Sequence, residues 1–224
     1  MNDMPLTQQH VNILHQAIRN YNYPTQLYDF EENQPIPFRT MRELENYLQV
    51  RLLSNNPSQV RCALANIVYW GNVNAGYCMF RVQKFLDNVT EDQIQSATNL
   101  FPNIEGDGLA EIKRIGLPQF SNMSFVSKLR MFLDPRNYVT LDRKLLKLKE
   151  SNIRTFFDDV IERPTYIPIN NRNRKQYRVW SKKCKDTANN YFQDHGIIAA
   201  DVERGIFYLV DRGNLNTAAT LAQI

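Results

Sequence analysis

Apolar residues at helical spacing, repeatedly interrupted by helix-capping residues, are the feature that most constrains the fold of this chain. Residues 40–43 (TMRE) and 90–93 (TEDQ) have the order of a capping box, in which a threonine and a glutamate or glutamine three positions later bind each other's backbone N–H groups. Sustained period-two alternation, the pattern of half-buried strands, is not found, and there is no internal repeat. The chain is therefore predicted to be all-α, or nearly so.

Caps and helix-breaking residues divide the chain into a series of expected helices. Thr7 and the Asn56-Pro57 pair are typical helix starts, and Gly116 and Gly196 each separate two helices. Expected helices begin near residues 8, 41, 57, 74, 91, 108, 122, 142, 176 and 201. Residues 21–38 and 158–174 are predicted to be irregular, apart from a short β-like stretch at 165–169, and the tail after residue 213 is predicted to fray.

Composition is that of an ordinary globular protein. The 224 residues fit a single domain, and 43% hydrophobic residues with 22% charged residues are enough to build a core. No apolar run reaches the ~20 residues of a membrane-spanning helix. The first ten residues also lack the basic flank and apolar stretch of a signal peptide. We therefore expect a cytoplasmic protein without a membrane partner; the family resemblance described below adds the expectation that it is nucleoid-associated.

Metal and disulfide chemistry are not expected. Cys62, Cys78 and Cys184 are an odd number of widely spaced cysteines, and the three histidines are equally scattered. The net charge of +4 and the pI of about 8.9 nevertheless leave room for a basic face.

The window from residue 108 to residue 148 has the most informative order of elements. A helix stopped by Gly116 is followed by a short hairpin and a second helix, and a loop containing Pro135 then leads to Asp142 at a helix start. This order resembles the helix-hairpin-helix DNA glycosylase superfamily, particularly its 8-oxoguanine DNA glycosylase-like branch, over about residues 56–148. Small stand-alone members of this kind also resemble bacterial anti-phage DNA glycosylases.

The resemblance implies a two-lobed helical bundle with its hairpin motif at about residues 108–134 and a basic helical part at about 172–212. It also implies an enzyme that flips a modified base out of double-stranded DNA and hydrolyses its N-glycosidic bond, leaving an abasic site. The substrate would be either an oxidised purine, in base excision repair, or a glucosylated hydroxymethylcytosine of phage DNA, in antiviral defence. The expected protein is a monomer without a cofactor, apart from a monovalent cation that the family often holds at the hairpin.

Asp142 and Lys128 are the candidate catalytic residues. A fixed carboxylate stabilises the positive charge that develops on the sugar, or activates water, and a helix start keeps Asp142 ionised. Alternatively, Asp142 is an ordinary N-cap residue without a catalytic role. Lys128 lies at the border of an apolar helix face, where desolvation favours a neutral, nucleophilic amine; the alternative is a lysine whose stem covers apolar surface. The nucleophilic lysine of bifunctional relatives aligns near Asn122, where this chain has none, so AP-lyase activity stays open.

Candidate DNA-binding residues occur in four places. The hairpin is expected to present backbone N–H groups to a phosphate, and Asn72 and Asn74 are candidates to fill the gap left by the flipped base, or are plain turn residues. Residues 172–185 contain seven basic residues, which favour phosphate contact over a merely solvated helix. The full set is Asn72, Asn74, Gly116, Gln119, Ser121, Asn122, Arg143, Lys144, Arg174, Lys175, Arg178 and Lys182.

Two other functions compete with the glycosylase. A non-catalytic helix-hairpin-helix DNA-binding module would keep the hairpin and the basic helix but would not need Asp142. A helical interaction protein with an accidental hairpin match would show no salt-sensitive DNA binding.

Overall fold

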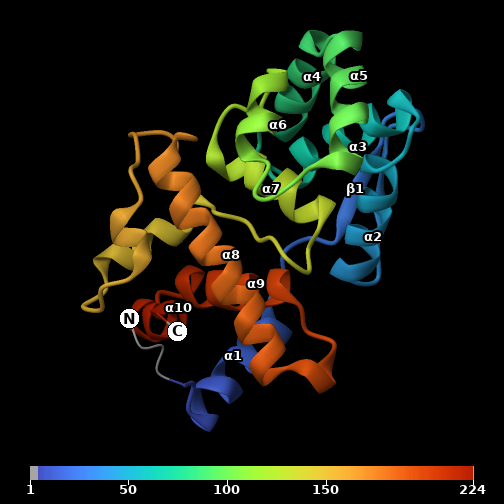
Figure 1. Cartoon of the computed structure of the whole chain (residues 1–224). Coiled ribbons are helices and arrows are strands. Elements are labelled where there is room, and N and C mark those ends of the chain that lie inside the picture. The colour runs from blue at the N-terminus through green and yellow to red at the C-terminus, as the bar shows by residue number, and fades with distance from the viewer. Residues whose placement is uncertain (1–4, 224) are drawn as a thin grey trace. The chain divides into compact units, whose positions relative to one another are not determined.

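The computed structural model describes residues 5–223 and confirms a mostly helical chain with a single two-stranded sheet in this range (Figure 1). The α-helices are α1 (Gln8–Asn20), α2 (Met41–Leu52), α3 (Pro57–Trp70), α4 (Cys78–Asn88), α5 (Glu91–Leu100), α6 (Leu109–Ile115), α7 (Met123–Leu133), α8 (Asn171–Tyr191), α9 (Ala199–Asp211) and α10 (Leu215–Gln223). The strands are β1 (Gln26–Asp29) and β2 (Gln34–Pro37), and the 3-10 helices are η1 (Phe101–Asn103), η2 (Arg143–Glu150), η3 (Phe156–Asp159) and η4 (Gln193–His195).

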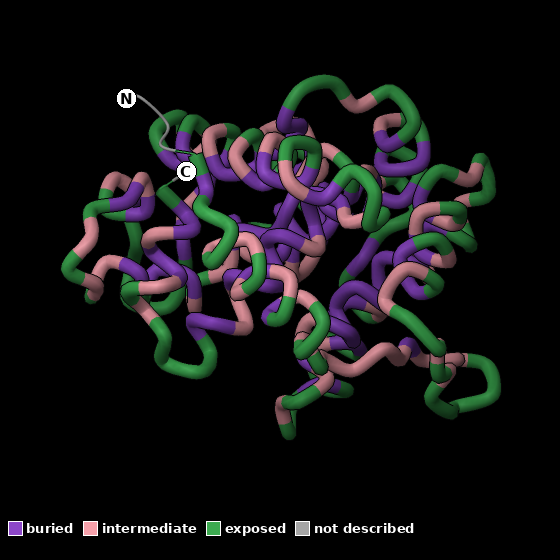
Figure 2. The backbone as a smooth tube through the Cα atoms, turned by 90° about the horizontal axis from the view of Figure 1, so that it is seen from below, coloured by how far each residue is buried: buried purple, intermediate pink, exposed green. Residues whose placement is uncertain are grey.

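The chain divides into two compact units. The continuous unit runs from Tyr23 to Asp134, and the split unit joins the residues up to Asn22 with those from Pro135 onward. In Figure 2 buried residues (purple) recur at intervals along the helical segments, as expected for helices that each bury one face.

The core of the continuous unit is built around α3. This helix packs against α2, α4, α5, α7 and β1, and its residues from Ala63 to Val68 are almost fully buried. Trp70, at its C-terminal end, contacts Tyr23 and Phe132 edge to face, with ring centroids 4.9 and 5.1 Å apart. Burial on all sides explains why α3 is apolar nearly all round, whereas surface helices bury a single stripe.

The core of the split unit depends on the close approach of α1 and α9, which lie side by side in Figure 1 although they come from opposite ends of the chain. A Cβ atom at Gly205 would lie 2.7 Å from Ile18 Cγ1 and 2.9 Å from Leu14 Cδ1. Only glycine therefore allows this helix crossing without displacement. On the other side of α9, α8 contributes Tyr177 and Trp180, both almost fully buried.

Most of the predicted caps are present. Thr7 and Asn56 accept hydrogen bonds from backbone N–H groups in the first turns of α1 and α3, and Thr90 forms a complete capping box with Gln93. At α2 the box is incomplete: Thr40 accepts from Glu43 N–H, but the Glu43 carboxylate accepts from Arg39 N–H instead of the Thr40 N–H.

Residues 21–38 are not irregular throughout, as predicted, but contain the antiparallel pair β1–β2. The prolines of β2 occur in a two-stranded sheet, where strand edges need no further ladder partner. Asn66 of α3 fixes β1 in place, since its Oδ1 accepts from Tyr28 N–H at 2.7 Å and its Nδ2 donates to Tyr28 O at 3.1 Å. This support comes from a residue far along the chain, so the local pattern could not reveal it.

Other boundaries also differ from the prediction. Residues 74–77 form turns and α4 begins at Cys78, and the segment after Asp142 is a 3-10 helix. No strand forms at 165–169, and α8 begins at Asn171 because Asn170 caps it through a hydrogen bond from Asn173 N–H. The tail does not fray after residue 213: α10 is helical and buries Ala218, Ala219, Leu221 and Ala222.

Candidate functional site

The hairpin between α6 and α7 is anchored by two apolar side chains. Leu117 and Phe120 are buried, and Phe120 N–H donates to Leu117 O at 3.1 Å to close the turn. Gly116 ends α6 with a φ of 75°, the left-handed conformation that favours glycine. Its carbonyl accepts a hydrogen bond from Gln93 Nε2 of α5 at 2.9 Å. The turn is therefore fixed from inside the continuous unit, and Gly116 and Ser121 are exposed on its outer side.

The start of α7 is capped by Asn122. Asn122 Oδ1 accepts from Phe125 N–H at 3.3 Å, which uses one of the first-turn N–H groups of α7. Gln119 holds a φ of 69°, a left-handed conformation that is uncommon for a residue other than glycine. These predicted hairpin residues thus lie together on one turn, in the geometry of a helix N-terminus that binds phosphate elsewhere.

Lys128 lies on α7 and is largely buried, with 9% of its surface exposed. Its Nζ is 5.6 Å from the centroid of the Phe125 ring. The predicted border position on the helix is thus a nearly buried one, which is an unusual location for a lysine.

Asp142 is the N-cap of η2 and belongs to the split unit. Its Oδ1 accepts a hydrogen bond from Lys144 N–H at 3.0 Å, and the side chain is half-buried. Lys144 in turn forms an ion pair with Asp211 and places its Nζ 5.3 Å from the Phe207 ring centroid. The Asp142 carboxylate is therefore held at a helix start, as predicted, although that helix is 3-10 and not α.

An open groove of about 410 Å³ adjoins η2. Three of its lining residues are basic and two are acidic: Arg143, Lys144, Leu146, Lys147, Glu150 and Glu162. Arg143 and Lys144 were predicted to contact DNA, whereas Lys147 was not selected from the sequence. Its position within a 3-10 helix in which four of the eight residues are basic was the available signal.

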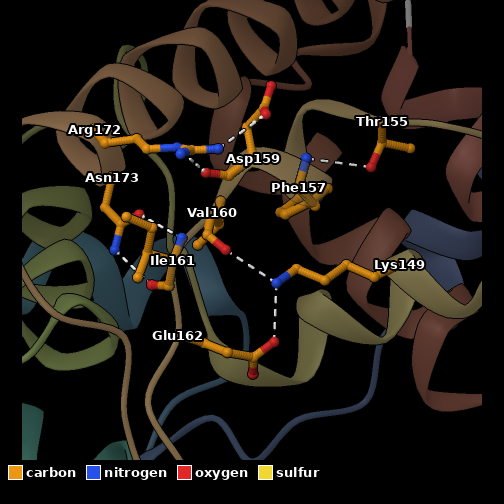
Figure 3. A network of polar contacts seen from close by, with 9 residues as sticks. All are labelled: Lys149, Thr155, Phe157, Asp159, Val160, Ile161, Glu162, Arg172 and Asn173. Atoms are coloured by element: carbon orange, nitrogen blue, oxygen red, sulfur yellow. Dashed lines mark hydrogen bonds and ion pairs between the residues drawn. The ribbon is translucent and has the colours of Figure 1, made fainter.

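A network of polar contacts holds residues 155–168 against α8 and η2 (Figure 3). Asn173 is fully buried: its Oδ1 accepts from Ile161 N–H at 2.8 Å, and its Nδ2 donates to Ile161 O and Pro168 O at 2.7 and 2.8 Å. Lys149 Nζ donates to Val160 O at 3.0 Å and binds Glu162 Oε1 at 2.9 Å. Arg172 pairs with Asp159 at 3.2 Å. This network fixes the first turn of the basic helix.

The basic residues of α8 form a stripe on its exposed face. Its members recur every three or four residues and are exposed: Arg172, Lys175, Arg178, Lys182 and Lys185. The opposite face is buried and contains Tyr177, Trp180 and Cys184. Trp180 Nε1 donates to Thr140 O at 3.0 Å, which orients the helix. The predicted residue Arg174 is only half-exposed, and Lys185 belongs to the stripe although it was not selected.

Asn72 and Asn74 occupy different environments. Asn72 is buried, and its Nδ2 donates to Val68 O of α3 at 2.8 Å. Asn74 is exposed on the turn between α3 and α4. Of the two predicted gap-filling residues, Asn72 therefore has a structural role at the end of α3, as its turn reading anticipated.

Burial raises the pKa of each cysteine thiol. Desolvation is the main cause for Cys62, Cys78 and Cys184, and the neighbouring Glu203 carboxylate adds to the effect at Cys184. All three are free thiols. Arg51 near Cys62 and Lys183 near Cys184 act in the opposite direction, but desolvation outweighs them, so the raised pKa values are unlike the lowered pKa of a reactive cysteine nucleophile.

Comparison of the chain with family models, curated proteins and solved structures found no match. Within residues 5–223, no group of three or more His, Cys, Asp or Glu side chains is arranged to hold a metal ion. No helix of the described range is long and apolar enough to cross a membrane.

Proposed function

We propose that this protein is a DNA glycosylase that flips a modified base out of double-stranded DNA and hydrolyses its N-glycosidic bond. In this proposal α6, the turn at residues 116–122 and α7 form the helix-hairpin-helix motif of a two-lobed glycosylase fold. The observation that supports it most is the Asp142 carboxylate, half-buried at the start of η2 in the segment that follows this hairpin.

Asp142 would act on the sugar. As the C1′–N bond breaks, positive charge develops on the sugar, and an ionised carboxylate beside C1′ stabilises that charge. A water oxygen then bonds to C1′, and the departing base keeps the electron pair and takes up a proton. The hydrogen bond from Lys144 N–H holds one carboxylate oxygen of Asp142 in place.

Phosphate contacts would come from the stripe of α8 and from the hairpin. The stripe from Arg172 to Lys185 extends over roughly 20 Å of helix, enough to meet several phosphates of one strand. Gly116, Gln119, Ser121 and Asn122 would offer the hairpin backbone to a further phosphate, where a monovalent cation could also bind. Two of the basic residues of the η2 groove, Arg143 and Lys144, extend this set.

Lys128 gives the proposal a second chemical route. A neutral Nζ amine would form a bond to C1′ as the bond to the base breaks, and the departing base would keep the electron pair of that bond and take up a proton. The nitrogen then loses a proton and the C1′–O4′ bond breaks, which opens the sugar ring with O4′ taking up a proton and leaves a Schiff base that borohydride reduces to a stable cross-link. Without that route the enzyme is monofunctional: Asp142 activates water, and no covalent intermediate with Lys128 forms.

Two substrate classes fit the proposal. One is an oxidised purine such as 8-oxoguanine, and the other is a glucosylated hydroxymethylcytosine of phage DNA. The test is the release of abasic sites by the purified protein from plain duplex, from 8-oxoguanine duplex and from phage DNA with hydroxymethylated or glucosylated cytosine. Alkaline cleavage measures the abasic sites, and borohydride trapping of each reaction measures the Lys128 route.

The decisive comparison is Asp142→Asn with a matched control. Asp29→Asn makes the same chemical change at an aspartate whose Oδ1 also accepts a backbone N–H two residues on, from Glu31 at 3.0 Å. Asp142→Asn should lower the excision rate by at least ~100-fold while binding persists, because the charge that stabilises the transition state is lost. Asp29→Asn should retain full activity. Salt-sensitive binding without excision of any substrate would favour the non-catalytic DNA-binding module.

A further inference from the structure

The end of the turn between α3 and α4 and the first residues of α4 expose large apolar side chains to solvent. Tyr77, Met79 and Phe80 form this apolar tip. Phe80 is 71% exposed, Tyr77 is 54% exposed and Met79 is 43% exposed. Elsewhere on α4, Cys78, Val82 and Phe85 form a buried face against the core of the continuous unit. The exposed side chains therefore lie on the opposite, outward side and are not part of that core.

The tip is held rigidly by the helices behind it. Cys78 N–H donates to Ala75 O at 2.9 Å, and Cys78 Sγ donates to Tyr69 O at 3.3 Å. Asn72 ties the preceding turn to α3 through Val68 O. Because these hydrogen bonds fix the turn, the backbone that carries Phe80 loses little conformational freedom when Phe80 contacts a binding partner.

Cations flank the apolar tip. The Arg81 guanidinium lies 5.1 Å from the centroid of the Tyr77 ring, and the exposed Lys84 follows Phe80 one helical turn later. The nearest acidic side chain along the helix, Asp87, accepts a hydrogen bond from Gln83 at 2.7 Å. A large apolar side chain beside two cations matches a nucleic-acid duplex, in which stacked bases lie between lines of phosphates.

We propose that Phe80, supported by Tyr77 and Met79, is a wedge that inserts between base pairs of duplex DNA and unstacks them. The inference rests on the proposed function, and it assigns insertion into the base stack to this aromatic tip. Asn72, one of the two residues predicted to fill the gap left by the flipped base, is not used for it, because its amide donates to Val68 O. Insertion of an apolar side chain kinks and partly unstacks a base step, which lowers the free energy needed to extrude the neighbouring base.

The test uses the whole protein and a stable duplex that requires no excision. The duplex carries an abasic analogue with 2-aminopurine beside it, and 2-aminopurine fluorescence rises when that base loses its stacking partner. Phe80→Ala should reduce the fluorescence rise and weaken binding roughly tenfold, because base–aromatic stacking is lost. Val50→Ala is the matched control, since Val50 is 67% exposed on α2 of the same unit. It should leave both readouts unchanged.

A second variant reports insertion directly. Both native tryptophans are buried, Trp70 at 4% and Trp180 at 1% exposure. In Phe80→Trp the new indole is the exposed fluorophore, and its emission should be quenched when duplex DNA is added. Quenching together with the loss in Phe80→Ala supports the wedge.

Three outcomes overturn the inference, and they differ from one another. Equal unstacking by Phe80→Ala and the native protein, with base excision intact, removes the wedge and leaves the proposed function standing. Absence of any DNA binding by the native protein removes both. A dimer in sedimentation that Phe80→Ala dissociates, with DNA binding unaffected, would make the tip a self-association surface.

Discussion

At the scale of single residues, the Cys184 thiol couples folding to pH. Burial, followed by the Glu203 carboxylate, raises its pKa well above that of an ordinary thiol. The folded protein therefore keeps the thiol protonated, while the unfolded chain loses the proton above about pH 8.5. This contribution to stability is complete below that pH and is lost as the pH rises toward the folded-state pKa.

Cys184→Ala should therefore flatten the alkaline limb of the stability profile. We expect the variant to be less stable by about 1 kcal/mol at pH 7, because a buried side chain is truncated. The difference from the native protein should shrink between pH 8 and pH 10, a range spanning the ordinary thiol pKa of about 8.5. Urea unfolding at a series of pH values measures it. A stability difference between the two proteins that stays constant from pH 8 to pH 10 would contradict the raised pKa of Cys184.

At the scale of elements, Asn173 joins α8 to the segment at residues 155–168. Its side chain satisfies Ile161 N–H, Ile161 O and Pro168 O from a fully buried position. Asn173→Ala should lower the free energy of unfolding by roughly 3 kcal/mol, since buried backbone groups lose their partners. Asn171→Ala, at an exposed position on the same first turn, should change it by less than about 0.5 kcal/mol. Urea denaturation distinguishes these results, and equal losses would show that the network adds no stability.

The exposed stripe of α8 makes a prediction about salt dependence. The logarithm of the DNA affinity falls linearly with the logarithm of the salt concentration, and each phosphate contact makes this slope steeper by about 0.9. Replacing Lys175, Arg178 and Lys185 with glutamine should lower this slope by up to about 2.7, with weaker binding at every salt concentration. Arg19→Gln, on the exposed last turn of α1, is the control. An unchanged slope in the triple variant would mean that α8 is only a solvated helix.

Helix starts could be predicted from the sequence because caps act within one turn. Thr7, Asn56 and Thr90 all cap the helices that their local pattern indicated. The β1–β2 pair was missed because Asn66 stabilises it from another element, and α10 was missed because tertiary burial of a short alanine-rich segment stabilises it. Contacts between distant parts of the chain have no local signature.

The candidate site was predictable to a similar degree. Spacing alone predicted the hairpin turn and the outward basic stripe of α8. It could not distinguish the buried Asn72 from the exposed Asn74, since both follow the same helix within four residues. The exposed tip at Phe80 was also hidden, because an apolar residue near a helix start is ordinarily core.

At the scale of the whole molecule, the two units differ in how the chain builds them. The continuous unit, residues 23–134, contains its own core around α3, whereas the split unit needs α1 from the start of the chain. Because Gly205 of α9 has no side chain, Leu14 and Ile18 of α1 can pack closely against α9 at this position. Without α1 the apolar face of α9 would be uncovered.

A fragment of residues 23–134 should therefore fold alone and unfold cooperatively in urea. Residues 135–224 should not fold alone, and adding a peptide of residues 1–22 should restore helical circular dichroism. The same peptide carrying Leu14→Asp is the control, because a charge cannot replace the fully buried leucine. Cooperative folding of residues 135–224 without the peptide would contradict this account.

The central claim, that the protein cleaves N-glycosidic bonds, is tested most directly by identifying the released base. Mass spectrometry of the small-molecule fraction would follow incubation with 8-oxoguanine duplex and with glucosylated phage DNA. We expect one free modified base from the native protein and from Asp29→Asn, and none above background from Asp142→Asn. No free base from either DNA, or equal release by Asp142→Asn, would contradict the proposed reaction or its active site.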